Sequence, residues 1–251
     1  MSAIRGFASG FIFLLLSGSL LARIPLERIE AHRLERALQP GMDAFGRNCA
    51  TLTLASISST LISLLPVLLF TIALSLALAL LSSGEKSHLR LLIRSTLDLF
   101  SALPGLLLAL SLGVVFPEAE LTAYLATTLM ILPSTVRYFE SFLRKIRSEE
   151  FILASNSMGA PPLHIWMYHL LPALRDSILT LLPFVTLRLI LIETSISFLG
   201  LTSVPQHETW GRLLAQGKDY LLEAPWILAC SAIPLCLLLA SFHLLSHDDR
   251  N

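Results

Sequence analysis

Charge is scarce in this chain of 251 residues. Lys and Arg number 18, Asp and Glu also number 18, and the four types make up 14% of the sequence. A soluble domain carries roughly 25% charged residues, and the mean hydropathy of this chain is +0.72. These values exclude an ordinary soluble domain and predict a membrane protein. No nucleic acid is expected among its partners.

Several motifs of catalytic chemistry are also missing. No G-x4-GK[ST] phosphate loop and no HExxH motif occurs. His164 and His169, five residues apart, are predicted to lie on different faces of a helix. Cys49 is predicted near the outer face of the membrane, and Cys230 and Cys236 are predicted to be buried in the last apolar block, with no CxxC pair. No catalytic residue, metal site or cofactor is expected.

Apolar residues are gathered into six blocks. Each is long enough, or nearly so, to cross a hydrocarbon core that needs about 20 residues of helix. The blocks are residues 6–22, 61–81, 99–116, 121–137, 177–200 and 225–245. Lipid offers the backbone no hydrogen-bond partners, so the blocks are expected to be helices. The predicted fold class is an all-α, polytopic transmembrane bundle of six spans, with kinks at Pro66, Pro104, Pro133, Pro183 and Pro234.

The first block has two interpretations. It is amino-terminal, with Arg5 before it and Arg23 after it, so a cleaved signal peptide is one alternative. The apolar part of a signal peptide usually has about 7 to 15 residues, and this block is longer. An uncleaved first span is therefore favoured.

Basic residues in the short loops predict the orientation of the chain. The loops assigned to the cytoplasm share an excess of Lys and Arg, namely Lys86, Arg90, Arg94, Arg144, Lys145, Arg147 and Arg175. The loop between the third and fourth blocks carries Glu118 and Glu120 and no Lys or Arg. Both termini and residues 138–176 are therefore predicted to be cytoplasmic, and residues 23–60 and 201–223 are predicted to face outward.

A polar stretch, EEFILASNSMGAPPLHIWMYHLLPAL, interrupts the apolar chain from Glu149 to Leu174. Acidic residues favour a helix start, and Phe151, Ala154, Ser155 and Met158 recur at helical spacing. Gly159 is predicted to end this helix in a left-handed conformation, and the two prolines that follow prevent its continuation. A short cytoplasmic helix over about residues 149–160 is expected. Its small residues would let another backbone approach closely.

The spacing of this stretch resembles a known motif. Glu150, Ala154, Ser155 and Gly159, with Leu171 and Pro172 further on, resemble the EAA motif of ABC importer permeases. Ser155 stands where that family usually has a second alanine. The sequence HLLP at residues 169–172 is similar to the HILP of the dipeptide permeases.

The resemblance covers roughly residues 40–245. GMDAFGRN at 41–48 looks like the GTDxxGRD segment of peptide and nickel permeases, although Met42 and Asn48 depart from it. Asp98, Ala102 and Pro104 match a D-x3-A-x-P pattern. ETSISFLGL at 193–201 is similar to the EASLSFLGLG of the family. The pattern of the family's outer loop follows, with Trp210-Gly211, Leu214, Gly217, Tyr220 and Ala224-Pro225-Trp226. The tail at 246–251 is shorter than that of the family and diverges from it.

The resemblance implies the C-type permease subunit of an importer of dipeptides, oligopeptides or nickel in the bacterial cytoplasmic membrane. The implied partners are a homologous permease subunit, two ATP-binding subunits and an extracytoplasmic solute-binding protein. The implied division is an amino-terminal helix and external segment (1–40), a permease core (41–245) and a short tail (246–251). The ligand is left open among peptide, nickel complex, other metallophore and polyamine.

Two other functions were weighed against this one. A membrane scaffold or sensor without transport would have no ATPase partner. An intramembrane hydrolase would have to use His164, His169, Glu149 and Glu150, which form no known motif. Both are less favoured than the permease.

Two charged residues lie inside the fifth block. An ionisable side chain at that depth costs a few kcal/mol on insertion scales and usually faces a bundle interior or a wet cavity. Arg188 and Glu193 are five residues apart, about 140° around a helix, so they are poor partners for one another. Glu193 is predicted to be a structural, hydrogen-bonding acid or to line the pathway. Arg188 is a candidate pathway-lining residue for an anionic group such as a peptide carboxylate.

Overall fold

The computed structural model describes residue 12 and residues 41–43, 46–83, 87–115, 119–159, 161–201 and 209–248. Within these ranges the regular elements are helices, apart from one isolated bridge between Met42 and Asn48. In chain order they are α3 (Cys49–Ser82), α4 (Ser87–Ala102), α5 (Gly105–Val115), α6 (Ala119–Arg147), α7 (Glu150–Ser157), α8 (Pro162–Ile165), the π-helical turn η1 (Trp166–Leu170), α9 (Leu171–Phe198), α10 (Trp210–Asp219) and α11 (Pro225–Asp248). The all-α prediction is confirmed.

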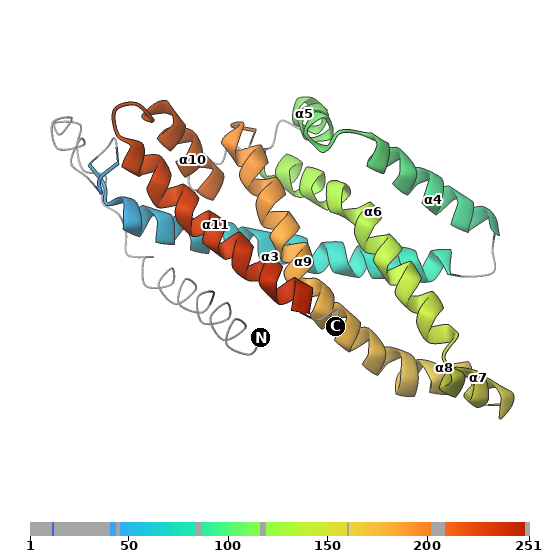
Figure 1. Cartoon of the computed structure of the whole chain (residues 1–251). Helices are drawn as coiled ribbons and strands as arrows, with labels where there is room; N and C mark the ends of the chain where they lie inside the picture. Colours follow the sequence, from blue (N-terminus) through green and yellow to red (C-terminus); the bar gives the residue numbers. More distant parts are fainter. Residues whose placement is uncertain are drawn as a thin grey trace.

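Helix α3 runs along most of the length of the molecule (Figure 1). The Asn48 side chain caps its start by accepting a hydrogen bond of 2.9 Å from the Ala50 amide. The helix therefore begins 12 residues before the predicted span at 61–81. At about 1.5 Å per residue, its 34 residues reach about 51 Å, more than the roughly 30 Å of a hydrocarbon core.

Burial along α3 differs from burial in a soluble protein, because hydroxyl residues are buried beside apolar ones and large apolar residues are left exposed. Thr71 and Ser75 are fully buried, while Leu65, Leu69 and Phe70 are exposed. Membrane helices pack through small residues because lipid supports large apolar side chains as well as a protein core does. Hydroxyl groups also bond within their own helix, as Ser82 does with the Ala79 carbonyl at 3.0 Å. The bundle is built for an apolar solvent.

Three described helices are long and apolar enough to cross a membrane. They are α3, residues 167–198 of η1 and α9, and residues 225–244 of α11. These correspond to the predicted second, fifth and sixth spans. The predicted first span lies outside the described residues, apart from Ile12. The fourth lies within α6, which continues ten residues further than predicted.

The predicted third span at 99–116 is wrong as a single helix. The chain instead forms α4 and α5, with a break at Leu103 and Pro104. Proline lacks the amide hydrogen and disfavours a helical conformation in the residue before it, so the helix ends instead of bending. The 11 residues of α5 reach about 16 Å, too short to span. Glycine at position 105 lets α5 lie against the side chain of Met130 in α6.

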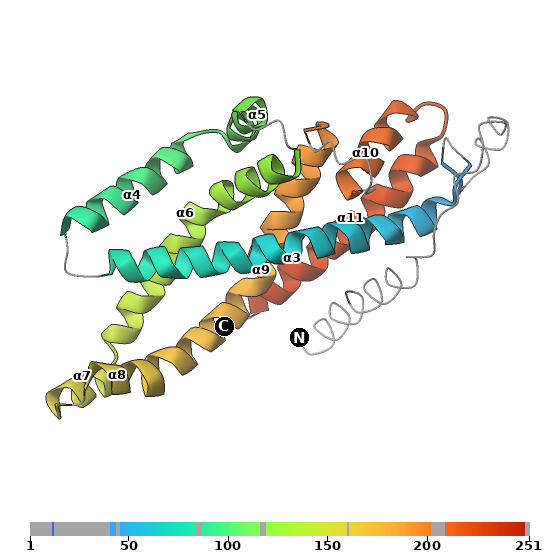
Figure 2. The ribbon, with the colours of Figure 1, turned by 180° about the vertical axis from the view of Figure 1, so that it is seen from behind.

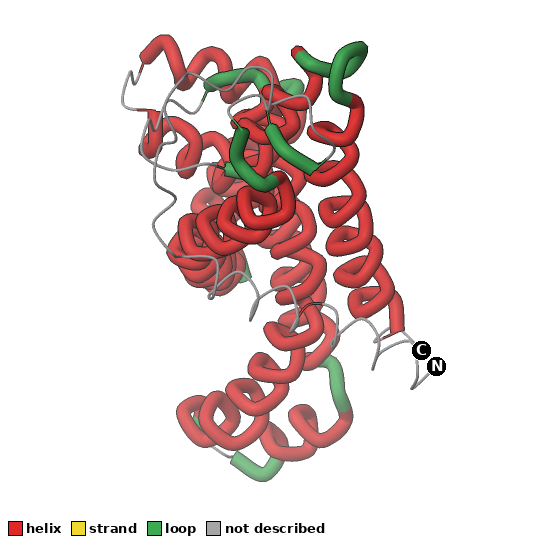
Figure 3. Tube along the Cα trace, turned by 90° about the vertical axis from the view of Figure 1, so that its left-hand side faces the viewer, coloured by secondary structure: helices red, strands yellow, loops and turns green. Residues whose placement is uncertain are grey.

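Two ends of the molecule have different architecture (Figures 1 and 2). The first turns of α3 and α11 meet α10 at one end, while α7 and α8 lie at the other. Helix α10, which falls in the predicted outer loop, is held by the fully buried Trp210. The indole of Trp210 donates to the Ser231 carbonyl at 2.9 Å, and its amide donates to the Thr60 hydroxyl at 3.2 Å. The α7–α8 end extends beyond the bundle (Figure 3).

Candidate functional site

The extended end is built from the polar stretch and from the helices on either side of it. Helix α6 ends in three basic residues, and its last carbonyls accept hydrogen bonds from the amides of Ser148 and Glu149. Helix α7 then begins at Glu150, an acid in the first turn that favours the helix dipole. Ile152 is buried in the main core and fastens α7 to the bundle.

The predicted end of α7 is confirmed. The last helical residue is Ser157, and Gly159 follows with φ of +78°. Residues with a side chain rarely adopt this left-handed conformation. A side chain at position 159 would meet no steric clash, because nothing lies within 4 Å of the position that a Cβ atom would take. The constraint on residue 159 is therefore its backbone conformation.

The predicted small-residue face of α7 is only partly confirmed. Phe151, Ala154 and Met158 are exposed, but Ser155 is buried with Ile152 on the side that faces the bundle. Ser155 therefore anchors the helix and is not available to a partner. Sequence spacing alone placed it on the wrong side, because α7 is too short for its apolar pattern to decide which side is covered.

The two histidines come together, contrary to the prediction. Their ring centroids are 6.1 Å apart, and the His164 ring also lies 4.6 Å from the Tyr168 ring. The cause is η1, because a π-helical turn joins residues five apart where an α-helix joins residues four apart. His169 also packs on Phe151 of α7 at 5.4 Å. Ring contacts thus hold α7 against the start of α9.

Exposed apolar side chains cover this end. We define the docking patch by its exposed large residues, which are Phe151, Met158, Met167, Tyr168 and Leu171. Met158 is 81% exposed. Of the other predicted site residues, Glu150, Ala154 and Pro172 are also exposed. Contiguous exposed apolar groups with a polar surround are typical of a protein interface.

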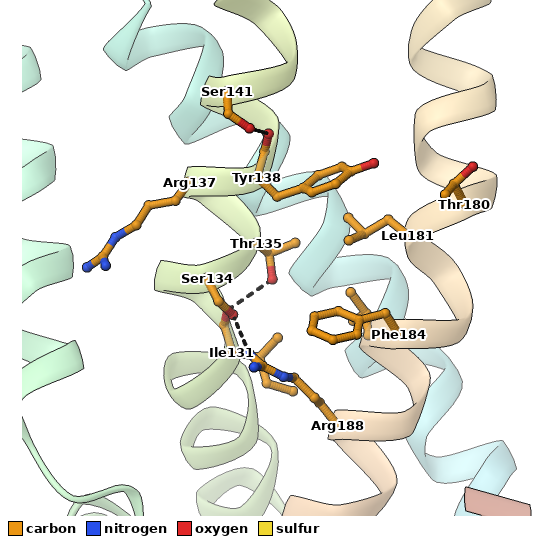
Figure 4. Close-up of a pocket in the computed structure, with 11 residues that line it drawn as sticks. Ile131, Ser134, Thr135, Arg137, Tyr138, Ser141, Thr180, Leu181, Phe184 and Arg188 are labelled. Atoms are coloured by element: carbon orange, nitrogen blue, oxygen red, sulfur yellow. Dashed lines mark hydrogen bonds between the residues drawn. The ribbon is translucent and has the colours of Figure 1, made fainter. Parts of the chain in front are cut away.

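A second feature is a cavity of about 380 Å³ between α6 and α9 (Figure 4). Its walls carry many hydroxyl groups together with two arginines. The lining residues on α6 are Ile131, Ser134, Thr135, Arg137, Tyr138 and Ser141, and those on α9 are Thr180, Leu181, Phe184, Val185 and Arg188. Apart from Arg188, sequence reasoning missed these polar residues, Arg137 included, because isolated polar residues in an apolar helix carry no distinctive pattern.

Arg188 lines this cavity. Its guanidinium donates a hydrogen bond of 3.0 Å to the Ser134 hydroxyl and lies 4.6 Å above the ring of Phe184. No carboxylate within the described part of the chain forms an ion pair with it. The guanidinium is held in place by neutral groups, the Ser134 hydroxyl and the Phe184 ring.

Arg137 is the other arginine of the cavity, and it points away from Arg188 (Figure 4). Its guanidinium donates to Asp98 of α4 and to Ser101, both at 2.9 Å. Arg137 and Asp98 thus form an ion pair between α6 and α4. Of the two arginines that line the cavity, Arg188 is therefore the one without a carboxylate partner among the described residues.

Glu193 is not among the lining residues. It is buried between α9 and the neighbouring helices, and its carboxylate is hydrogen-bonded to Ser197 one turn further on. The second carboxylate oxygen has no partner in the described part of the chain. Close by, Gly211 lets α10 approach α9, since a Cβ atom there would stand 2.4 Å from the Thr194 carbonyl. This placement favours the structural alternative for Glu193.

Comparison with known proteins decides the family. A family model described as the binding-protein-dependent transport system inner membrane component matches residues 70–247. The chain belongs to this family. It is 28% identical over 257 residues to a protein of Brucella suis named as a peptide transport system permease, covering 98% of this chain and 86% of that protein. It is also 28% identical over 163 residues to the glutathione transport system permease protein of Escherichia coli, covering 64% and 53% respectively.

The chain is thus a permease component of an ABC importer and a multi-pass membrane protein. A permease component is not itself an enzyme, because separate subunits hydrolyse ATP.

One buried acid of this permease, Glu140 in α6, was not identified from the sequence. It accepts from Arg94 at 3.2 Å and from Ser82, and so ties α4 and α3 to α6.

Proposed function

We propose that this permease forms half of the translocation pathway of a peptide importer and receives its driving force at the docking patch. The observation that carries the proposal is the patch itself, which is apolar, exposed and set at one extreme end of the molecule. Exposed apolar side chains that project from the bundle mark a binding surface for another protein. The basic residues predict that this end faces the cytoplasm. The bound protein is a cytoplasmic ATP-binding subunit.

The coupling residues are those of the polar stretch. Glu150 starts α7, Ala154 allows close approach, Ser155 anchors the helix to the bundle, and Gly159 sets the turn. Leu171 and Pro172 begin α9, so a push on α7 is passed to a helix that lines the cavity. The Phe151–His169 contact makes this transfer direct.

The assembly consists of this chain, a homologous permease subunit, two ATP-binding subunits and an extracytoplasmic solute-binding protein in the bacterial cytoplasmic membrane. Residues 41–245 act as the permease core, and both termini lie in the cytoplasm. The names of the relatives support a peptide as solute, and glutathione is itself a small peptide. Arg188 binds a carboxylate of the solute as it passes, since no carboxylate among the described residues pairs with it.

The test uses two substitutions of exposed residues at opposite ends. Ala154→Trp places a bulky ring on α7, and Leu222→Trp places one at the α10–α11 turn, where Leu222 is 98% exposed. With all five subunits co-expressed, Ala154→Trp is expected to detach the ATPase or stop uptake at an unchanged membrane level, and Leu222→Trp is expected to do neither. Equal ATPase yield and uptake from both variants would reject docking at α7.

The same preparation identifies the solute. Mass spectrometry of the ligand that co-purifies with the solute-binding protein is expected to find a peptide. A nickel complex, another metallophore or a polyamine would leave the permease role intact and overturn the choice of substrate. Isolation of the intact chain with no ATP-binding subunit would favour a scaffold or sensor.

A further inference from the structure

Two cysteines meet at the end of the molecule opposite the docking patch. Cys49 is the first residue of α3 and is 4% exposed, while Cys230 lies half-buried in the second turn of α11. The hydroxyl of Thr53 lies within hydrogen-bond distance of both cysteine carbonyls, at 2.8 Å from that of Cys49 and 3.2 Å from that of Cys230. One small side chain thus bridges the two backbones.

The side chains converge as well. Cys49 forms a buried cluster with Ala224 and Ile227, and Cys230 packs against that cluster. The first turn of α3 and the second turn of α11 thus bring both cysteines to the same buried cluster.

The surrounding turn holds α3 against α11. The Cys49 amide donates to the Gly41 carbonyl at 2.9 Å, and the Trp226 indole donates to the Met42 carbonyl at 3.0 Å. Gly41 is thereby fastened to the start of α3, and Met42 to the start of α11. These bonds hold the start of α3 close to the start of α11, where the two cysteines lie.

We propose that Cys49 and Cys230 are joined by a disulfide in the assembled importer. The proposal rests on the proposed orientation, which places this end outside the cytoplasm, where disulfides persist. The oxidant is the disulfide of an extracytoplasmic thiol–disulfide oxidoreductase. The more accessible Cys230 attacks it to form a mixed disulfide, and Cys49 displaces the oxidoreductase. The oxidoreductase leaves as a dithiol, having accepted two electrons and the two protons of the cysteines.

Cys236 is the control that the chain itself offers. It lies six residues beyond Cys230 on the same helix but is exposed, so the prediction that it is buried is wrong. It takes no part in the buried cluster and is expected to stay reduced. The three thiols therefore divide into one oxidised pair and one free group.

The experiment counts thiols in the full chain, co-expressed with its partner subunits. Membranes are quenched with acid, dissolved in SDS and treated with a polyethylene glycol maleimide, with or without prior reduction. One adduct per chain is expected without reduction and three after it. Cys236→Ser is expected to give none and then two, while Cys49→Ser and Cys230→Ser are each expected to give two under both conditions.

Other outcomes overturn the proposal. Three adducts on more than half of the unreduced wild-type chains would mean that the pair is reduced. A single adduct from unreduced Cys49→Ser would mean that Cys230 is bonded to another chain. Because the orientation is tested separately at positions 156 and 222, as described below, a reduced pair in a correctly oriented chain would overturn the disulfide and leave the proposed function standing.

Discussion

Gly159 shows how much a single residue can control in this permease. Its φ of +78° turns the chain between α7 and α8, and the space around it is open. An L-residue pays roughly 1 to 2 kcal/mol in this region, asparagine less than most. The position therefore separates an effect of backbone conformation from an effect of size.

We expect Gly159→Val to lower uptake by roughly tenfold, since 1.4 kcal/mol is a factor of ten in the population of the docked turn. Gly159→Asn adds a side chain of similar bulk that tolerates the left-handed region, so it is expected to retain most of the activity. Uptake and ATPase co-purification are compared at matched membrane levels. Equal loss from both variants would show that size, not conformation, matters at this position.

Arg188 is the second residue with a distinct physical role. It sits in the interior part of α9, where a charge is costly, and its contacts are a hydroxyl and an aromatic ring. Neither contact offsets the charge, so the residue is explained best by a transient anionic partner. Arg137, in the same cavity, already has Asp98.

We expect Arg188→Gln to lower uptake of a peptide with a free carboxylate by roughly tenfold or more, because a hydrogen bond to a charged group contributes about 1.5 to 3 kcal/mol. Arg137→Gln is the control, since its exposed ion pair is worth at most about 1 kcal/mol. Uptake is measured in liposomes with saturating binding protein. Normal uptake by Arg188→Gln would exclude carboxylate binding at this residue.

At the scale of elements, the link from α7 to α9 depends on the turn η1. A π-helical turn inside an α-helix is equivalent to one extra residue. It lets Phe151, His164, Tyr168 and His169 pack together and aligns α8 with α9. Removing one residue from this turn restores ordinary helical spacing without rotating α9.

We therefore expect deletion of Met167 to leave the bundle stable, with the chain at a normal level in the membrane. Deletion of Leu179, an exposed residue in the regular part of α9, shifts one half of the helix by about 100° relative to the other and is expected to abolish folding. Membrane level and the thermal stability of the detergent-solubilised complex are the measurements. If both deletions lower the membrane level and the thermal stability equally, η1 does not act as one extra residue in the helix.

At the scale of the whole molecule, orientation connects the two ends. The docking patch and the Cys49–Cys230 pair lie at opposite ends of the bundle (Figures 1 and 2). A membrane between them requires that a reagent confined to one side label only one of them. The basic residues at the end of α6 predict which side each end occupies.

We expect a cysteine at position 156 to react only after the membrane is opened, and a cysteine at position 222 to react with an impermeant maleimide in intact cells. Both are introduced into a chain in which Cys49, Cys230 and Cys236 are replaced by serine. Labelling of position 156 from outside would contradict the whole proposed topology, including the site of ATPase docking.

The sequence by itself determined the class of this protein and predicted the segment proposed here for coupling. Low charge and long apolar blocks are properties of composition, and they predict a membrane bundle whatever its packing. The end of α7 was also predictable, because glycine and the two prolines act on their own backbone. The family resemblance at 149–172 and 193–201 rested on short local patterns that need no knowledge of neighbours.

Only the tertiary structure decided which groups meet. Whether Ser155 is covered, whether Pro104 bends a helix or ends it, and whether His164 reaches His169 all depend on what packs alongside. The cavity around Arg188 is lined by α6 and α9, and the cluster that brings Cys230 to Cys49 joins α11 to α3. In an apolar solvent every face of a helix is allowed to be apolar, so the pattern that marks the buried side of a soluble helix is weak, and only contact between helices distinguishes the faces.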